Sequence, residues 1–447
     1  MVCNKLKNKL NVVVGLGKTG LSCVSFCLRQ GWPVAVTDSR ENPPCAAELK
    51  KLAPHVETAF GQISKDLIDK ASQLIISPGV SLKEAVIFAA IQRGISYVGD
   101  IELFAQNVSA PIIAITGSNA KSTVTTLVGE MAKQAGIKVE VAGNIGLPVL
   151  DLLEKSKAEL YVLELSSFQL ETTHSLKAKV AVVLNISEDH MDRYESMEEY
   201  VAAKRKVYDG CESAVIYMKH RGWDIGCEDR VLFGLERPLA DQYGVIEDDN
   251  ETYLAYGDER LLNVKELKLF GRHNVENALA ALAIGKAASI DKESMLKALR
   301  EFPGLSHRCQ FIRKLNGISW YNDSKGTNVG ATIAALEGFG ADIDGKIVLI
   351  AGGVGKGADF IPLQKQVKKF VRKTILIGEA AKELSEVLSD CCEVELATSM
   401  QQAVQLAKVS AVLGDVVLLS PACASFDMFR DYQHRGDEFV KLVNRIE

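Results

Sequence analysis

The sequence predicts an α/β protein built from three domains. Its 447 residues correspond to about three domains of roughly 150 residues each. Short β-branched runs alternate with helical patterns along nearly the whole chain, which is typical of mainly parallel sheets covered by helices on both faces. Neither a sequence repeat nor a low-complexity tract interrupts this alternation.

The composition excludes several other classes of protein. Hydrophobic residues make up 47% and charged residues 24%, which argues against disorder, collagen and coiled coil. The 57 acidic and 52 basic residues give a net charge of −5, which offers no footprint for nucleic acid. No apolar run approaches the ~20 residues of a membrane span, and the ten cysteines form no Cys-x-x-Cys pair. We therefore expect a soluble, cytoplasmic, monomeric protein without nucleic-acid partner or membrane insertion.

Shifts along the pattern divide the chain into three spans. The first block closes near Gly99-Asp100, and Pro303-Gly304 marks a hinge, so the domains are predicted over residues 1–99, 100–304 and 305–447. Residues 222–266 are polar and predict loops and short antiparallel strands, and a helix is expected over residues 274–289. Further strands are predicted at residues 11–14, 34–37, 74–76, 112–115, 160–163, 180–184, 318–321, 347–350, 374–377 and 416–419.

A glycine-rich turn follows the first strand and is expected to open a helix after Gly20. Its sequence is Gly15-Leu-Gly17-Lys-Thr-Gly20, and Asp38 ends the next strand. Such glycines let a phosphate approach the backbone at a helix N-terminus, with the acid beside a ribose. The pattern does not identify the nucleotide, and glycine also serves tight packing alone. The turn 77–79 could face the same crevice.

A second loop, residues 116–123, follows the strand at 112–115 and precedes a helix. It reads Thr-Gly-Ser-Asn-Ala-Lys-Ser-Thr and places Lys121 and Ser122 where a phosphate loop holds the lysine for the β- and γ-phosphates and the hydroxyl for Mg²⁺. The loop is two residues shorter than the usual pattern, and Ala120 stands where glycine is expected. Nucleoside triphosphate binding is favoured over a chance turn.

Further polar residues lie just after strands of the central domain. Glu164 could hold Mg²⁺ through oxygen or be a solvated strand end, and His190, in an acidic loop, is a candidate metal ligand or a structural histidine. Lys204, by pattern alone, belongs to a solvated basic helix face. Asn274 could cap the helix that follows, and Asn277 could bind a purine edge.

Polar loops of the third domain also fall at predicted strand ends, where open α/β sheets bind ligands. They are residues 323–328, 352–357 and 420–425, with His307-Arg308 after the hinge. Their two lysines, the arginine and several hydroxyl groups suit an anionic substrate.

Taken together, these motifs closely resemble the Mur ligase family of bacterial peptidoglycan synthesis, over essentially the whole chain. The matching segments are residues 15–20, 116–123, 164–170, 188–194, 273–277, 323–328 and 420–439. The block 420–425 with Asp427, Phe429 and Arg435-Gly436 resembles the D-glutamate-adding members in particular.

The resemblance implies an N-terminal Rossmann-like domain, a central ATPase domain of the phosphate-loop type and a C-terminal Rossmann-like domain. It implies that ATP phosphorylates the carboxylate of UDP-N-acetylmuramoyl-L-alanine, which gives an acyl phosphate and ADP. The amine of D-glutamate then attacks, and a tetrahedral intermediate collapses to amide and phosphate. This logic agrees with the residues, because a transferring phosphoryl group needs positioned positive charge.

The resemblance also assigns residues to each ligand. For ATP they are Gly117, Ser118, Asn119, Ala120, Lys121, Ser122, Thr123, Asn277, Arg308 and Asp323. For the uridine-nucleotide substrate they are Leu16, Thr19, Asp38, Ser39, Arg40, Ser77, Pro78, Gly79, Asn144 and His190. For D-glutamate they are Lys325, Thr327, Lys356, Ser425 and Tyr432. Two Mg²⁺ ions, or Mn²⁺ in their place, are assigned to Ser122, Glu164, His190 and Lys204, the last as a carbamate formed with CO₂. The implied catalytic set is Lys121, His190, Lys204 and Lys325.

Four departures from the family pattern stand out. Ala120 replaces a usual glycine and is expected to strain the loop if that position needs a positive φ. Gly326 replaces alanine and is expected to loosen its loop. Ser306 and Gln310 replace proline and glutamate, which affects the ATP role of the hinge, and Tyr432 replaces phenylalanine and adds a hydroxyl group. No proposed metal ligand or lysine is lost, so we expect an active enzyme.

Three other functions compete with this interpretation. A nicotinamide dehydrogenase would use the glycine-rich turn but leaves Lys121-Ser122 and the third domain unexplained. A folylpolyglutamate-synthetase-like ligase, or a Mur ligase that adds another amino acid, shares the central and C-terminal logic. A catalytically inactive nucleotide-binding regulator is disfavoured by the intact lysines and metal ligands.

Overall fold

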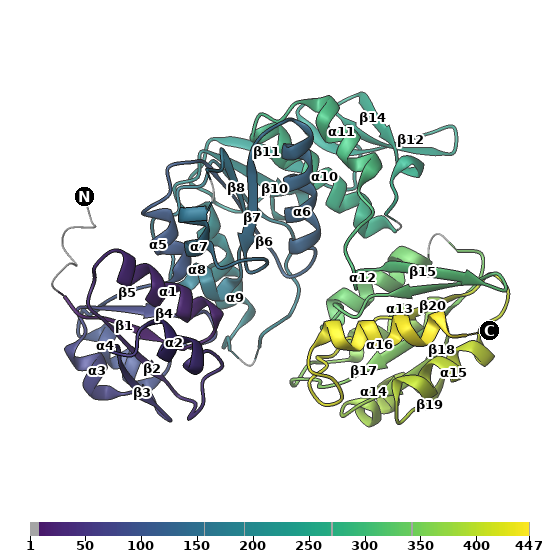
Figure 1. Cartoon of the computed structure of the whole chain (residues 1–447). Coiled ribbons are helices and arrows are strands. Elements are labelled where there is room, and N and C mark those ends of the chain that lie inside the picture. The colour runs from purple at the N-terminus through teal and green to yellow at the C-terminus, as the bar shows by residue number, and fades with distance from the viewer. Residues whose placement is uncertain (1–8, 156, 192, 270, 341–342, 447) are drawn as a thin grey trace.

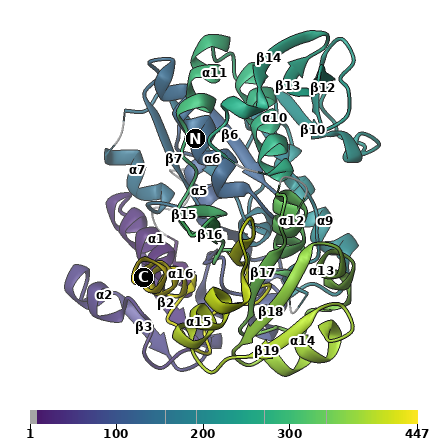
Figure 2. The ribbon, with the colours of Figure 1, turned by 90° about the vertical axis from the view of Figure 1, so that its right-hand side faces the viewer.

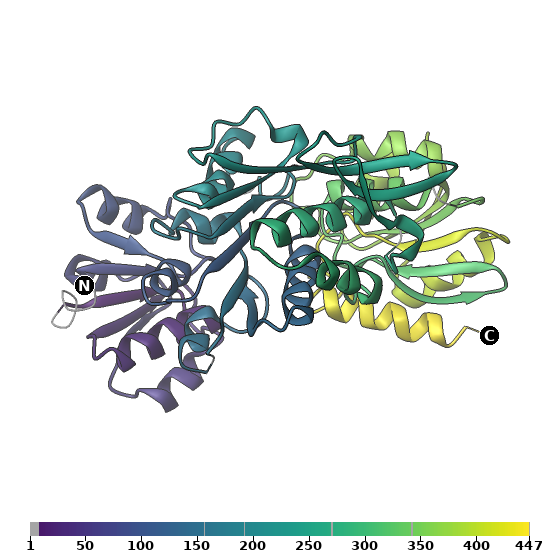
Figure 3. The same cartoon turned by 90° about the horizontal axis from the view of Figure 1, so that it is seen from above.

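The computed structural model describes residues 9–155, 157–191, 193–269, 271–340 and 343–446, and it shows three α/β bodies in a row (Figure 1). Each body is built on one sheet, and the sheets have five, nine and six strands. The predicted three-domain α/β architecture is therefore confirmed. Seen from above, the first and last sheets lie at opposite ends of the molecule (Figure 3). Among the helices that the structure describes, none combines the length and apolar character required for a membrane span.

The N-terminal sheet is parallel throughout, in the strand order β3-β2-β1-β4-β5. Its central strand β1 is completely buried, as expected for a β-branched run covered on both faces. The helix predicted after Gly20 begins earlier, at Lys18, and Gly20 lies in its first turn, where a Cβ atom would come within 2.0 Å of the Gly15 carbonyl oxygen. The elements are β1 (Asn11–Val14), α1 (Lys18–Arg29), β2 (Val34–Asp38), α2 (Ala46–Leu52), β3 (Glu57–Phe60), α3 (Lys65–Lys70), β4 (Gln73–Ile76), α4 (Ala85–Gln92) and β5 (Ser96–Val98).

The central sheet has the order β14-β13-β12-β11-β10-β9-β6-β8-β7, in which β12 pairs with β13 and β13 with β14 in antiparallel fashion, and the other described pairs are parallel. The antiparallel strands predicted within residues 222–266 are confirmed for β12 to β14. The prediction is wrong for β11, which runs parallel to β10 because its buried Val231 and Phe233 extend the main sheet. The helix predicted at 274–289 begins and ends two residues earlier. The elements are α5 (Asp100–Ala105), β6 (Ile112–Thr116), α6 (Lys121–Gln134), β7 (Val139–Gly143), α7 (Val149–Lys155), β8 (Leu160–Glu164), α8 (Ser167–Glu171), β9 (Val180–Val183), α9 (Met197–Arg205), β10 (Ser213–Tyr217), β11 (Asp229–Phe233), β12 (Gln242–Asp248), β13 (Glu251–Tyr256), β14 (Glu259–Asn263), α10 (Arg272–Ala287) and α11 (Lys292–Glu301).

The C-terminal sheet has the order β15-β16-β20-β17-β18-β19, and β15 alone is antiparallel to its neighbour. Because β16, β20 and β17 are adjacent and parallel, the loops at their carboxyl ends lie at one edge of the sheet. These are the three polar loops that the sequence placed at strand ends. The elements are β15 (Gln310–Leu315), β16 (Ile318–Asn322), α12 (Val329–Gly340), β17 (Ile347–Gly352), α13 (Gln364–Phe370), β18 (Val371–Ile377), α14 (Ala381–Leu388), β19 (Glu393–Leu396), α15 (Met400–Ser410), β20 (Val416–Leu419) and α16 (Tyr432–Asn444).

One hydrophobic cluster continues from the N-terminal domain into the central domain. It joins Phe26 and Cys27 of α1 to Leu150 and Leu152 of α7, all of them buried. Within the described parts of the chain, the two clusters of the C-terminal domain contain no residue before Cys309. The first two domains therefore share a core, whereas the third has cores of its own.

The C-terminal domain meets the central domain along α12, which lies beneath α10 (Figures 1 and 2). Glycines allow this close approach. A Cβ atom at Gly338 would lie 2.6 Å from Nδ1 of His273, and one at Gly330 would lie 2.8 Å from Oγ of Ser187. The first turn of α12 is thereby seated against the central domain.

Candidate active site

The loop 116–123 connects β6 to α6 and encloses its own lysine. The Lys121 ammonium donates to the carbonyl oxygens of Gly117 and Ser118 at 2.8 and 2.9 Å, and desolvation lowers its pKa. Ala120 has a φ of 65°, so the position does require the left-handed conformation that favours glycine. The side chain of Ala120 therefore costs about 1 kcal/mol at this turn.

Ser122 and Glu164 lie side by side, because β6 and β8 are paired in the sheet. The Ser122 hydroxyl donates to Oε2 of Glu164 at 2.5 Å, and the Asn144 amide donates to Oε1 at 2.8 Å. Arg308 reaches across from the C-terminal domain and donates to the same hydroxyl at 2.6 Å. Two oxygens of the kind that Mg²⁺ prefers are thus adjacent to a guanidinium group.

Lys204 is buried, contrary to the solvated face that its helical pattern suggested. Its side chain is 2% exposed, and its amine donates to the carbonyl oxygen of Gly117 at 2.9 Å. The amine also lies 4.5 Å from the centre of the Tyr200 ring. Burial, together with the nearby charge of Lys121, lowers the pKa of Lys204 well below its ordinary value.

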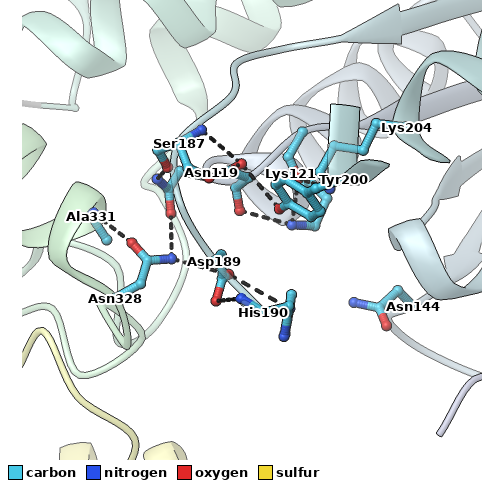
Figure 4. A network of polar contacts seen from close by, with 12 residues as sticks. Asn119, Lys121, Asn144, Ser187, Asp189, His190, Tyr200, Lys204, Asn328 and Ala331 are labelled. Carbon is cyan, nitrogen blue, oxygen red and sulfur yellow. Dashed lines mark hydrogen bonds and ion pairs between the residues drawn. The ribbon is translucent and has the colours of Figure 1, made fainter. Parts of the chain in front are cut away.

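His190 lies opposite Lys204 across a cavity of about 310 Å³ (Figure 4). The residue has a φ of 59°, its ring is 4.8 Å from that of Phe168, and burial lowers its pKa. The cavity brings together residues of the central and C-terminal domains. Among its lining residues are Lys121, Ser122, Asn144, Glu164, His190, Lys204, Arg308, Lys325, Thr327, Lys356, Ser425 and Tyr432.

The side of this cavity formed by the C-terminal domain is basic. Lys325 lies over the Tyr432 ring at 4.0 Å, and burial with the nearby charge of Arg308 lowers the pKa of Lys325 to about 8. Thr327 and Lys356 complete the side. This arrangement suits the carboxylates of a small amino acid.

A neighbouring cavity of about 380 Å³ is lined by Thr123, Asn277 and Asp323, which are also expected to contact ATP, whereas Gly117 lines neither of these two cavities. Asn277 donates to Oδ1 of Asn274 at 3.0 Å, so Asn274 orients the Asn277 amide. Burial raises the pKa of Asp323 to about 6. Tyr217, Lys219 and His220 also line this cavity, and the sequence did not point to them because they lie at the end of β10 and just after it, in a stretch without a motif.

A third cavity, of about 600 Å³, lies at the glycine-rich turn. Its lining includes Thr19, Asp38, Ser39, Arg40, Ser77, Pro78, Gly79 and Asn144 of the predicted nucleotide residues. Leu16 and His190 are not among its lining residues: the Leu16 side chain is buried in the core, and His190 faces the cavity described above. Gln169 and Gly146 line this cavity as well, although no motif pointed to them.

Asp38 is already fully engaged by the protein. It accepts from the Leu16 amide at 2.7 Å and from two nitrogens of the Arg40 side chain. Burial opposes ionisation, but these hydrogen bonds prevail and lower the pKa of Asp38 to about 2. Because both carboxylate oxygens have donors, the acid is poorly placed to bind the ribose of a dinucleotide, which weighs against a dehydrogenase.

Arg435 ties the three polar loops of the C-terminal domain together. Its buried guanidinium donates to Ser324 and to the carbonyl oxygens of Gly352, Cys423 and Ala424. The family motif contained this arginine, but its pattern gave no role. The structure shows that it fixes one loop against the others.

Two further departures from the family pattern acquire a structural account. At Gly326 a Cβ atom would come within 2.6 Å of Oδ2 of Asp323, so this glycine permits a tight turn. The Gln310 side chain accepts from the His307 amide at 3.0 Å and thus supports the hinge. Nothing in the structure explains Ser306.

The sequence matches one family along most of its length. Residues 9–99 match the description "Mur ligase MurD-like, N-terminal domain", residues 115–285 "Mur ligase middle domain" and residues 307–423 "Mur ligase, glutamate ligase domain". The chain belongs to the Mur ligase family. Within this family it is 51% identical over 441 residues to the UDP-N-acetylmuramoylalanine--D-glutamate ligase of Pseudomonas fluorescens, which covers 97% of the chain and 98% of the relative. The enzyme of the same name from Coxiella burnetii is 50% identical over 442 residues, covering 98% and 99%.

Solved structures agree with this family at the level of the fold. A pseudomurein peptide ligase type C from Methanothermus fervidus aligns with a TM-score of 0.62 at 18% identity, over 98% of this chain and all of that one. MurF ligase from Thermotoga maritima, solved in complex with ADP, aligns with a TM-score of 0.62 at 16% identity, over 99% and 97%. At such identities the Mur ligase fold alone is shared.

Proposed function

We propose that this Mur ligase adds D-glutamate to UDP-N-acetylmuramoyl-L-alanine with ATP, as a cytoplasmic step of peptidoglycan synthesis. The observation that carries the proposal is the full-length identity of 50–51% with ligases named for this reaction. The site supports it, because the three cavities adjoin. Asn144 lines both the cavity at the glycine-rich turn and the cavity that contains Lys204. Asn119, Ala120, Arg308 and Lys325 line both the Lys204 cavity and the cavity that contains Asn277.

In the first step the substrate carboxylate becomes a better electrophile. Its oxygen attacks the γ-phosphorus of ATP, an O–P bond forms, and ADP leaves. Lys121 and Arg308 line the same cavity as Ser122 and would supply positive charge toward the transferring phosphoryl group. The acyl phosphate then carries phosphate as its leaving group.

The donor set fits divalent metal ions. Ser122 and Glu164 present hard oxygens 2.5 Å apart, to which we assign one Mg²⁺, and His190 and Lys204 line the same cavity and would hold a second ion. Mn²⁺ could take either place. When bound, the ions neutralise charge on the β- and γ-phosphates. The described residues include no group of three or more His, Cys, Asp and Glu side chains suited to a metal, so the hydroxyl group and a modified lysine are needed.

Lys204 is assigned as a carbamate, because an ammonium group cannot bind a cation. Its lowered pKa favours the neutral amine, whose nitrogen attacks the carbon of CO₂, forms the N–C bond and releases one proton. Labelling with ¹³CO₂ is expected to give a carbamate carbon signal in NMR spectra that is absent in Lys204→Ala. Lys204→Ala is also expected to lose nearly all activity and to regain part of it with short-chain carboxylic acids. Wild-type activity in this variant would refute the metal role.

In the second step the neutral amine of D-glutamate attacks the acyl carbon. The C–N bond forms, a tetrahedral intermediate collapses with cleavage of the C–O bond to phosphate, and the amine loses a proton. Lys325, Thr327, Lys356, Ser425 and Tyr432, which line the cavity, would hold the two carboxylates of D-glutamate.

The proposal is tested by phosphate release in a four-component assay. We expect release only when ATP, Mg²⁺, UDP-N-acetylmuramoyl-L-alanine and D-glutamate are all present. Equal turnover with L-glutamate, L-lysine or meso-diaminopimelate would contradict the assignment of D-glutamate as substrate and would favour a Mur ligase that adds another amino acid. Competition by UDP separates the proposal from a folylpolyglutamate-synthetase-like ligase, which needs no uridine pocket. We further propose a monomer, which sedimentation velocity measures directly.

A further inference from the structure

Asn328 joins the C-terminal domain to both central-domain loops of the site. The residue ends the loop that carries Lys325 and Thr327, just before α12, and Figure 4 shows its side chain between that helix and the central domain. Its amide oxygen accepts from the Ala331 backbone at 2.8 Å and so caps the first turn of α12. Its amide nitrogen points away from the helix.

The amide nitrogen has two acceptors in the central domain. It donates to Oδ1 of Asn119 in the phosphate loop at 3.3 Å and to Oδ2 of Asp189, next to His190, at 3.2 Å. The orientation of the Asn328 amide is fixed by chemistry, because a backbone N–H faces one end and a carboxylate faces the other. An aspartate at this position would keep the cap and lose both donors.

The acceptor on the phosphate loop is itself held in place. The Asn119 amide nitrogen donates to Oγ of Ser187 at 3.1 Å, and the Ser187 backbone donates to Oγ of Ser118 at 2.9 Å. That hydroxyl contacts the Tyr200 hydroxyl at 3.1 Å, one turn before Lys204 on α9. A continuous chain of hydrogen bonds therefore runs from Asn328 through the phosphate loop to α9 (Figure 4).

A second observation marks the same contact. Gly330 lies in the first turn of α12, and a Cβ atom there would come within 2.8 Å of Oγ and 3.0 Å of Cβ of Ser187. The helix is thus seated directly on the residue that orients Asn119. Adding a methyl group would separate the two surfaces without touching Asn328.

We propose that Asn328 is a positioning residue that sets the amino-acid loop against the phosphate loop. Its two ends fasten α12 on one side and Asn119 with Asp189 on the other. The amine held by the loop 323–328 is thereby delivered to the acyl phosphate, and a displacement of about 1 Å in such an arrangement costs on the order of 100-fold in rate. The inference rests on the proposed function, since it assigns the C-terminal loop to D-glutamate.

The test compares variants that separate the contacts of Asn328 with the central domain from its cap on α12. Asn328→Asp keeps an acceptor for the Ala331 backbone and has no donor. Asn328→Ser keeps the acceptor but replaces the amide N–H donors by one O–H on a shorter side chain. Asn328→Ala loses acceptor and donors, and Gly330→Ala adds a methyl group at the contact between α12 and Ser187. Ser399→Ala is the matched control, because Ser399 caps α15 of the same domain through the Gln402 backbone at 3.2 Å and forms no hydrogen bond with a described residue of the central domain. Kinetics are measured with D-glutamate and, separately, with hydroxylamine, which traps the acyl phosphate as a hydroxamate.

We expect Asn328→Asp, Asn328→Ser and Gly330→Ala to lower kcat/KM for D-glutamate by about 100-fold, with hydroxamate formation within about threefold of wild type. Ser399→Ala should leave both unchanged. A kcat/KM for D-glutamate within about twofold of wild type in Asn328→Ser and Gly330→Ala, or an effect confined to Asn328→Ala, would overturn the positioning role of Asn328. If Asn328→Asp does not fold, the serine and Gly330 variants decide alone. Wild-type enzyme that makes no product would instead refute the proposed function.

Discussion

The central domain holds its two neighbours by different chemistry. Against the N-terminal domain it buries apolar side chains in one continuous cluster, supported by a 2.7 Å hydrogen bond from Ser22 of α1 to Asp151 of α7. Against the C-terminal domain the described side-chain contacts at the site are polar: Arg308 to Ser122, and Asn328 to Asn119 and Asp189. Both interfaces lie next to ligand cavities, but only one is a core.

This difference indicates which domain moves. Separating the first interface would expose apolar surface at about 25 cal/mol per Å², whereas water can replace most of what a polar contact loses. We therefore expect the first two domains to move as one body and the C-terminal domain to close over the ligands. Small-angle scattering with and without all ligands measures this closure, and identical profiles would contradict it.

The largest effect is expected from damage to the shared core. Leu150→Ala removes a completely buried side chain that packs between the two domains, and we expect the free energy of unfolding to fall by about 2–5 kcal/mol. Urea titration measures it. Leu384→Ala, equally buried in the C-terminal cluster, is the control, and hydrogen exchange should place its cost in the C-terminal domain. An unchanged unfolding free energy for Leu150→Ala would break the comparison.

Arg308→Ala disrupts the polar interface between the central and C-terminal domains instead. It removes the guanidinium that reaches Ser122, and we expect kcat/KM to fall about 100-fold while the melting temperature changes little. Arg300→Ala, which breaks the exposed ion pair with Glu266, serves as the control and should leave kcat/KM unchanged. A large loss of stability with little loss of activity would reverse the assignment of the two interfaces.

The polar interface should also make the enzyme sensitive to pH. With the pKa of Lys325 at about 8, we expect kcat/KM for D-glutamate to fall about tenfold per pH unit above that value. Deprotonation of Lys325 does not itself destabilise the fold: between pH 8 and 10.5 the unfolded chain keeps the proton that the folded chain has lost, so this group makes stability rise with pH there. Lys325→Arg should remove the decline, and a decline that persists would assign it to another group.

The smallest effect is expected at the edge of the first interface. Lys83 of the N-terminal domain pairs with Glu195 and Glu199 at 3.0 and 2.9 Å, but all three side chains are well exposed. Lys83→Ala should therefore lower the free energy of unfolding only slightly, and salt should diminish the difference. A larger, salt-independent cost would mean that charge, as well as apolar packing, holds the two domains together.

Much of the architecture could be predicted because its signals are local. Buried β-branched runs such as 11–14 and 112–115 identify parallel strands without any knowledge of their neighbours. The same locality explains the errors. Partly exposed strands such as β3 and β19 lack an apolar run. The direction of β11 is set by its pairing with β10, which the local sequence does not reveal.

The site residues could be predicted where they lie in a loop or at a strand end and their residue type suits one chemical role. Lys121, Ser122 and Glu164 lie together because their strands are paired, which the strand ends already indicated. Lys204 was not predictable as a buried group, since its helix reads as polar and its burial depends on packing around Tyr200. Contacts between domains, such as that of Asn328, need the relative placement of two sheets, and no sequence pattern encodes it.

The shared core also affects the order in which the domains can fold during synthesis on the ribosome. Domains generally fold as they emerge, first to last. Here α1 cannot bury Phe26 completely until α7, which ends at Lys155, has been synthesised, so the first domain waits with an exposed apolar face beyond its own boundary. The C-terminal domain closes its own clusters and incurs no such delay. The demand for chaperones should therefore peak while the segment after residue 99 is being translated and be low at the later hinge.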